Sequence, residues 1–127
     1  MAFDPMIVVD DVEATSRFYQ QLLGLKSAHG GKEYEMLTDA AGVLALQLHL
    51  ADAEEHGTAH PPPGAPRGVG VVFYFKVADV RAAYATAQGM GATCEGAPEF
   101  FAPARHTVFV VRDPHGYAIA IFQSGEA

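Results

Sequence analysis

The chain has 127 residues, with 8 Lys and Arg against 15 Asp and Glu, a formal net charge of −7, and half of its residues are hydrophobic. This composition excludes a disordered chain, and the acidic balance excludes a nucleic-acid-binding surface, because affinity for phosphate depends on clustered Lys and Arg. The single cysteine, Cys94, cannot close a disulfide within the chain, and no apolar run is long enough to cross a membrane. We therefore expect a cytoplasmic globular protein with no nucleic-acid or membrane partner.

The first half predicts a strand, a helix and a terminal hairpin. The apolar run 6–9 predicts a strand, and Asp11 is placed to cap the helix that follows. Apolar residues at 18, 19, 22 and 23 share one face of that helix, and Gly24 is a natural stop. The sequence Asp39-Ala-Ala-Gly predicts a turn before a strand over 43–50.

The second half repeats this order. Val, Asp, Val and Ala recur at an offset of 68 between residues 9–14 and 77–82, after an apolar run over 71–77. Asp79 is placed to cap a helix with Val80, Ala83, Tyr84 and Ala87 on one face, ending around Gly89 and Gly91. The turn Asp113-Pro-His-Gly echoes Asp39-Ala-Ala-Gly at an offset of 74, so we place the six extra residues in the 95–104 loop.

These landmarks predict an α+β fold built from two modules in one chain. Module one covers residues 1–50 and module two residues 68–123. Each contains a strand, a helix and about three further strands. The segment 51–67, with three consecutive prolines, is expected to be a linker. Two strand–helix starts also arise by chance in α+β proteins, but a second landmark in the same order favours a true repeat.

Three motifs carry a resemblance to a known family. They are IVVDDV at 7–12 with FY at 18–19, LLGL at 22–25, and DPHGY at 113–117. Together they resemble the vicinal oxygen chelate superfamily, which includes glyoxalase I, the bleomycin-resistance proteins and the extradiol dioxygenases. The resemblance implies two βαβββ modules, each with its sheet curled into a cup, and a homodimer.

The resemblance also places four metal-ligand positions, at Asp4, Gln47, Val72 and Ala120. Val and Ala have no lone pairs, and one carboxylate with one amide is too few ligands for a catalytic Zn, Ni or Fe site. We therefore expect no metal and no cofactor. This departure counts against isomerase or dioxygenase chemistry and favours the metal-free, drug-binding branch of the superfamily.

Strand alternation supplies the other residues expected in the cup. Tyr74 and Phe122 have core packing as an equal alternative, and the adjacent Phe100 and Phe101 suit a dimer contact as well as a ligand lid. The predicted ligand-binding residues are Asp4, Met6, Gln47, His49, Val72, Tyr74, Phe100, Phe101, His106, Ala120 and Phe122.

Other polar residues have competing interpretations. Asp4 is expected to meet a cationic group, act as a base or cap a turn, and with His49 and His106 it would make a displaced metal site. Glu33 and Glu35 are interpreted as the solvated side of an edge strand, or as a pair that steers a cationic ligand.

The leading functional hypothesis is a metal-free protein that binds a drug or metabolite in the cup. The alternative is a glyoxalase-like lyase, isomerase or dioxygenase with an altered metal site. A metal-free enzyme that uses Asp4 or His106 as its general base stays open beside them.

Overall fold

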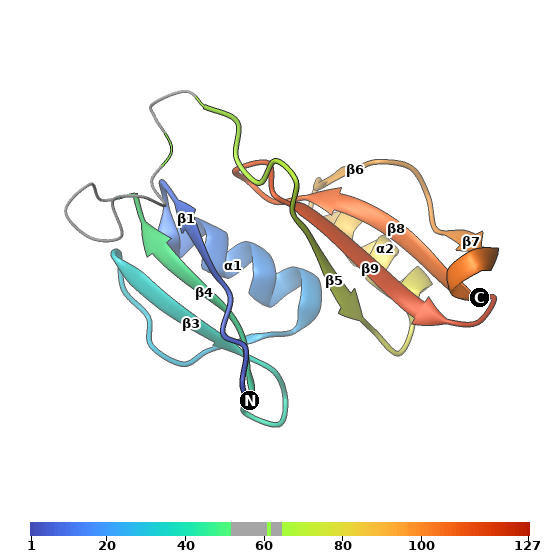
Figure 1. Ribbon diagram of the computed structural model, residues 1–127, viewed down its shortest axis with the longest axis horizontal. Helices are drawn as coiled ribbons and strands as arrows, with labels where there is room; N and C mark the ends of the chain where they lie inside the picture. The colour runs from blue at the N-terminus through green and yellow to red at the C-terminus, as the bar shows by residue number, and fades with distance from the viewer. Residues whose placement is uncertain (52–60, 62–64) are drawn as a thin grey trace. The chain divides into compact units, whose positions relative to one another are not determined.

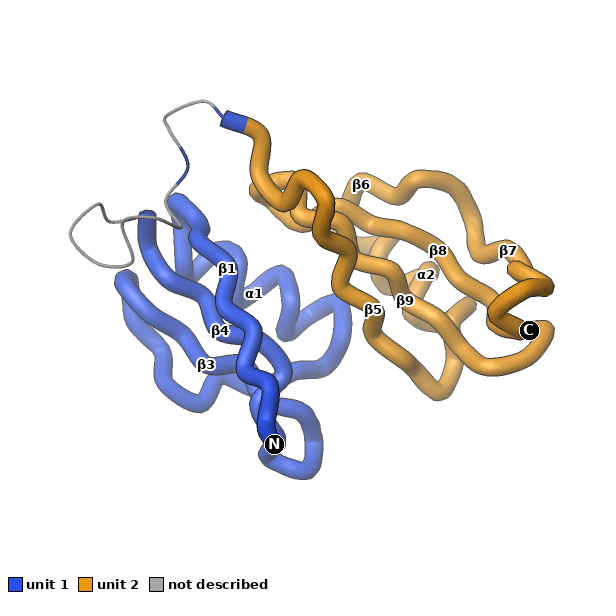
Figure 2. The backbone as a smooth tube through the Cα atoms, in the orientation of Figure 1, with its two compact units in different colours: residues 1–65 blue, residues 66–127 orange. Residues whose placement is uncertain are grey.

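The computed structural model describes residues 1–51, 61 and 65–127. The chain forms two compact units, unit 1 over residues 1–65 and unit 2 over residues 66–127, which Figure 2 colours separately. Most of the predicted linker, residues 52–60 and 62–64, lies outside the described residues.

Unit 1 contains one helix and one mixed sheet. Its elements are β1 (Met6–Val9), α1 (Val12–Leu23), β2 (Lys26–Ser27), β3 (Tyr34–Thr38) and β4 (Leu44–Leu50). The strands pair in the order β1-β4-β3-β2, with β1 parallel to β4 and the other pairs antiparallel (Figure 1).

Helix α1 begins and ends where the sequence predicts. The Asp11 carboxylate accepts a hydrogen bond from the Ala14 backbone N–H at 2.9 Å, which satisfies one of the free donors at the helix start. Gly24 adopts a left-handed conformation with φ of 68° and donates its N–H to the Gln20 carbonyl at 2.9 Å.

Alternation along β4 separates a helix-facing side from an open side. Leu46 and Leu48 are fully buried, and β4 packs against α1, so these leucines lie on the side of the sheet that the helix covers. Gln47 lies between them on the open side, half-buried, and pairs with Met6 of β1.

Unit 2 has the same order of elements with one insertion. Its elements are β5 (Val72–Lys76), α2 (Val80–Gly89), β6 (Thr93–Cys94), β7 (Glu99–Phe101), a 3-10 turn (Ala102–Ala104), β8 (His106–Arg112) and β9 (Ala118–Ser124). The sheet order is β5-β9-β8-β6, with β5 parallel to β9 and with β7 paired to β8. Strand β7 and the 3-10 turn lie within the 95–104 segment where the sequence placed the extra residues.

Helix α2 covers one face of this second sheet. The Asp79 carboxylate accepts from the Arg81 and Ala82 N–H groups at 3.1 and 3.0 Å, as expected for its cap. Beneath the helix, Val111, Ile119 and Ile121 are fully buried. The opposite face of the sheet carries no helix of its own unit.

The predicted α+β class with two βαβββ modules in one chain is therefore confirmed, and both sheets are open. No helix in the described ranges is long and apolar enough to cross a membrane.

Candidate ligand-binding site

The open face of the unit 2 sheet is ordered in rows by strand pairing. Residues paired across a sheet point to the same side. The first row contains Val72, Ala118 and Arg112, the second contains Tyr74, Ala120 and Val110, and the third contains Lys76, Phe122 and Val108. Ala118 and Ala120 in the middle strand are small and buried, at 6% and 1% exposure, between larger neighbours.

Aromatic rings gather along this face. The His106 ring lies 4.9 Å from Phe122, 6.2 Å from Tyr74 and 6.3 Å from Phe101, measured between ring centroids. Tyr74 and Phe122 are 5.9 Å apart in an edge-to-face arrangement. Four of the predicted ligand-binding residues, from four different strands, thus form one cluster.

A pocket of about 380 Å³ opens beside this cluster, and we call it the aromatic pocket. Tyr74 and Phe101 remain 60% and 53% exposed, so their rings are available at its surface. Two carboxylates, those of Glu95 and Glu99, lie at the same pocket. The lining residues are Tyr74, Glu95, Gly96, Ala97, Glu99, Phe100, Phe101, His106, Val108, Phe109 and Val110.

The two adjacent phenylalanines reach this pocket from different sides of β7. Phe101 pairs with His106 and faces the open side, whereas Phe100 pairs with Thr107, which is buried on the helix side. Both line the pocket because β7 is a short edge strand. The sequence placed both rings together in the cup and did not show that they come from opposite faces.

The open face of the unit 1 sheet carries a polar cluster instead. The Tyr34 hydroxyl donates to the Gln47 side-chain oxygen, and the Gln47 amide nitrogen donates to the Asp4 carbonyl at 3.0 Å. Burial, and then the negative charges of Asp4 and Glu35, raise the pKa of Tyr34. The Tyr34 phenol therefore stays protonated at neutral pH. Tyr34 was not among the site residues predicted from the sequence.

His49 is buried next to this cluster, at 7% exposure. Its Nδ1 lies 2.8 Å from the Leu50 carbonyl, which only accepts, so Nδ1 carries the proton. Tyr34 and His49 pair across β3 and β4, and their ring centroids are 6.3 Å apart. Met6 and Gln47 pair in the adjacent row.

Glu35 corrects the interpretation of a solvated carboxylate pair. Glu33 is exposed, but Glu35 is only 3% exposed and lies on the helix-facing side with Leu48. Its carboxylate accepts hydrogen bonds from the hydroxyls of Ser16 and Ser27 at 2.9 and 2.7 Å. Glu35 is therefore a structural anchor within unit 1 and is not available to steer a ligand.

The residues at the inherited ligand positions do not fit a catalytic metal ion. In unit 2, Val72 and Ala120 offer no donor atom, and in unit 1 the Gln47 oxygen already accepts from Tyr34. Of the residues considered for a displaced metal site, Asp4 and His49 belong to unit 1 and His106 to unit 2. Among the described residues, no group of three or more His, Cys, Asp or Glu is arranged to hold a metal.

A sequence profile decides the family. The profile of the Glyoxalase/Bleomycin resistance protein/Dioxygenase superfamily matches residues 4–121, which is nearly the whole chain. The chain belongs to this superfamily. The resemblance noted in the motifs at 7–25 and 113–117 is thereby confirmed, whereas no curated protein matches the chain.

Solved structures of other proteins share the fold. A glyoxalase/bleomycin resistance protein/dioxygenase from Nocardioides is 21% identical with a TM-score of 0.76, and the match covers 100% of this chain and 85% of that one. A protein of unknown function from Agrobacterium tumefaciens is 25% identical with a TM-score of 0.77, over 98% and 94% of the two chains. A lactoylglutathione lyase from the same bacterium is 17% identical with a TM-score of 0.69, over 97% and 92%. At these sequence identities, all three structures support a shared fold and assign no activity to this chain.

Proposed function

We propose that this superfamily member binds a planar small molecule in the aromatic pocket of unit 2, without a metal ion. The observation that carries the proposal is the cluster of Tyr74, Phe101, His106 and Phe122 beside a pocket of about 380 Å³. Small-molecule sites are typically concave and mostly apolar, with a few polar groups that fix orientation.

The exposed rings supply the affinity in this proposal. A ligand that covers Tyr74 and Phe101 removes apolar surface from water, and each stacked pair contributes about 1 kcal/mol beyond that burial. Several such contacts suffice for a dissociation constant on the order of micromolar. The alternative is that these rings only fill the core. It does not explain why the side chains of Tyr74 and Phe101 are more than half exposed.

The residues at the family's four metal-ligand positions support binding without a metal, because two of them, Val72 and Ala120, have no atom that can coordinate a cation. Orientation of the same ligand by Asp4, Gln47 and His49 stays a prediction, since these side chains belong to unit 1. The homodimer and the cytoplasmic location also stay predictions from the sequence.

Binding of the neutral fluorescent probe N-phenyl-1-naphthylamine tests the proposal. We expect saturable binding to the full chain in the presence of EDTA, and an affinity about fivefold lower after Tyr74→Ala or Phe101→Ala, because each substitution removes one stacking ring. Both side chains are exposed, so the fold should be retained.

Val43→Ala is the matched control. Val43 is also an exposed apolar residue, at 62%, but it lies in the β3–β4 turn of unit 1. The control should leave probe binding unchanged. Equal affinities for the wild type, the two ring variants and the control would refute the aromatic pocket as the site.

A further inference from the structure

A second pocket of about 570 Å³ lies on the same unit and has a different character. It is lined by the segment 66–72 and by the β8–β9 hairpin, and its charged or titratable side chains are Arg67, Arg112 and His115. None of the described residues that line it is an Asp or Glu. We call it the basic pocket.

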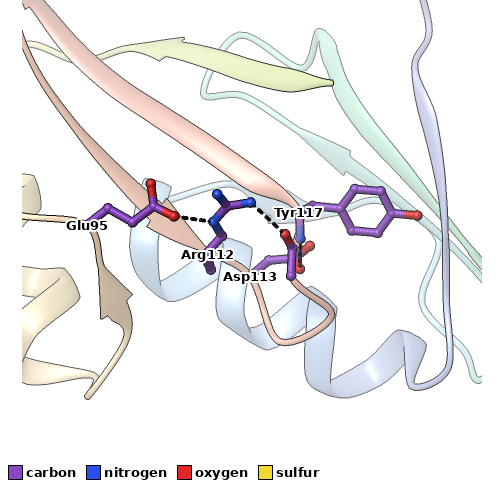
Figure 3. Close-up of polar contacts among 5 residues, drawn as sticks. Glu95, Arg112, Asp113 and Tyr117 are labelled. Atoms are coloured by element: carbon purple, nitrogen blue, oxygen red, sulfur yellow. Dashed lines mark hydrogen bonds and ion pairs between the residues drawn. The ribbon is translucent and has the colours of Figure 1, made fainter. Parts of the chain in front are cut away.

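Arg112 makes two polar contacts at this pocket, and its side chain is 40% exposed. Its Nε donates to the Glu95 carboxylate at 2.6 Å, and its Nη1 donates to the Gly116 carbonyl at 3.1 Å, as Figure 3 shows for the pair with Glu95. These two bonds orient the guanidinium plane and leave further N–H donors of the group for an anion. A guanidinium held in this way loses little side-chain entropy when it binds a carboxylate or phosphate.

The hairpin that carries His115 is also well ordered. Asp113 is 4% exposed, and its carboxylate accepts from the backbone N–H groups of His115 and Tyr117 at 2.8 and 3.0 Å. Figure 3 shows the contact between Asp113 and Tyr117. On the other wall, Gly68 lies so close to Tyr117 that a Cβ on it would meet the ring at 2.7 Å. The segment with Arg67 is therefore packed directly against the hairpin with His115.

The basic pocket and the aromatic pocket are neighbours on one open face. Val72, Ala118 and Arg112 form the row at the basic pocket, and Tyr74, Ala120 and Val110 form the next row, two residues further along each strand. That step is about 6–7 Å, roughly the distance from a ring centre to an acidic group carried on a two-carbon side chain. Arg112 lines the basic pocket and its ion-pair partner Glu95 lines the aromatic pocket, so the two pockets meet at this pair.

We infer that the ligand is an aromatic acid, with its ring in the aromatic pocket and its anionic group in the basic pocket against Arg112 and Arg67. The inference rests on the proposed function and adds the chemical class of the ligand to it. The shared chemistry is a flat ring with a carboxylate, sulfonate or phosphate.

Two fluorescent probes with related ring systems separate the inference from the proposed function. One is 8-anilinonaphthalene-1-sulfonate, which carries an anionic group, and the other is the neutral N-phenyl-1-naphthylamine. Arg112→Met and Arg67→Met should each weaken binding of the sulfonate probe by about tenfold or more, through loss of a charge-assisted hydrogen bond, and leave the neutral probe unchanged. Arg81→Met is the control, because it removes the same charge from the exposed surface of α2.

The outcomes are distinguishable. Selective loss of sulfonate binding in the two pocket variants supports the inference, and the retained neutral probe shows that those variants are folded. Unchanged sulfonate binding in both variants, or an equal loss in Arg81→Met, overturns the inference while the neutral probe still reports the aromatic pocket. Failure of both probes to bind the wild type overturns the proposed function and the inference with it.

Discussion

Replacing Glu35 with glutamine is expected to lower the free energy of unfolding by about 3 kcal/mol at neutral pH. The buried carboxylate accepts from both serine hydroxyls and, in addition, from the backbone N–H groups of His29, Gly30 and Met36 at 3.2, 2.8 and 2.9 Å. Glutamine has the same size, but its amide nitrogen would face groups that themselves donate. Denaturant-induced unfolding followed by circular dichroism measures the difference.

The same substitution predicts a pH dependence. Burial alone would raise the pKa of Glu35, but the hydrogen bonds from Ser27, Gly30, Ser16 and His29 outweigh it and leave the pKa below its ordinary value of 4.5. A carboxyl whose pKa is lowered by folding stabilises the protein above the unfolded-state pKa, and this stabilisation is lost as the pH falls through the folded-state pKa. The difference between wild type and Glu35→Gln should therefore shrink below about pH 4.5.

Glu33→Gln provides the control for both measurements. Glu33 is exposed two residues before Glu35, so its substitution should change stability by no more than about 0.5 kcal/mol at any pH. A loss of stability in Glu33→Gln equal to that in Glu35→Gln, or a difference that does not change with pH, would contradict the role assigned to Glu35.

Gly68→Ala is expected to destabilise unit 2 by about 2–3 kcal/mol. Gly68 has φ of 71°, which costs a residue with a Cβ about 1 kcal/mol, and the added Cβ would lie 2.7 Å from Tyr117 Cδ1 and 3.2 Å from its Cα. Tyr117 is only 9% exposed, so its ring has little room to move away. Thermal and denaturant unfolding of the full chain measure the loss.

Gly70→Ala separates the clash from the backbone strain. Gly70 has a similar φ of 80°, but nothing lies within 4 Å of an added Cβ. Its substitution should cost only the backbone term of about 1 kcal/mol. An equal loss of stability in Gly68→Ala and Gly70→Ala would contradict this explanation. It would mean that close packing of the segment 66–72 on the β8–β9 hairpin does not stabilise this side of the basic pocket.

The fold was predictable because its signals are local. The caps at Asp11 and Asp79 and the stop at Gly24 each depend on residues within a few positions, and all three appear in the structure. The β4 leucines follow the period of two that a sheet with one buried face imposes. The offset between the two repeated landmarks also located the insertion that forms β7.

The site was predictable only in part, because its geometry depends on pairing between distant strands. Alternation placed Tyr74 and Phe122 on the open face, and the resemblance placed Ala120 there. The strand register puts all three side chains on that face. The adjacent Phe100 and Phe101 could not be assigned to faces without knowing that β7 pairs with β8. The hydrogen-bond partners of Glu35 could not be predicted, because they too come from other parts of the chain. Its burial had one signal in the sequence: Leu37, two residues later on the same face of the strand, is apolar and fully buried.

Tyr34 and Arg112 illustrate a second limit. Each acts through a contact with a residue far along the chain, Tyr34 with Gln47 and Arg112 with Glu95. No spacing rule relates such pairs, because the approach is produced by the sheet and not by a local motif. Their chemistry was visible in the sequence, but their neighbours were not.

Amide NMR spectra of the full chain, stripped of metal with EDTA and titrated with N-phenyl-1-naphthylamine, test metal-free binding in the aromatic pocket most directly. We predict saturable shifts that are centred on the β5, β7 and β8 residues around Tyr74, Phe101 and His106, with no change when metal is restored. Shifts that appear only after Zn, Ni or Fe is added, or that leave these strands unaffected, would contradict it.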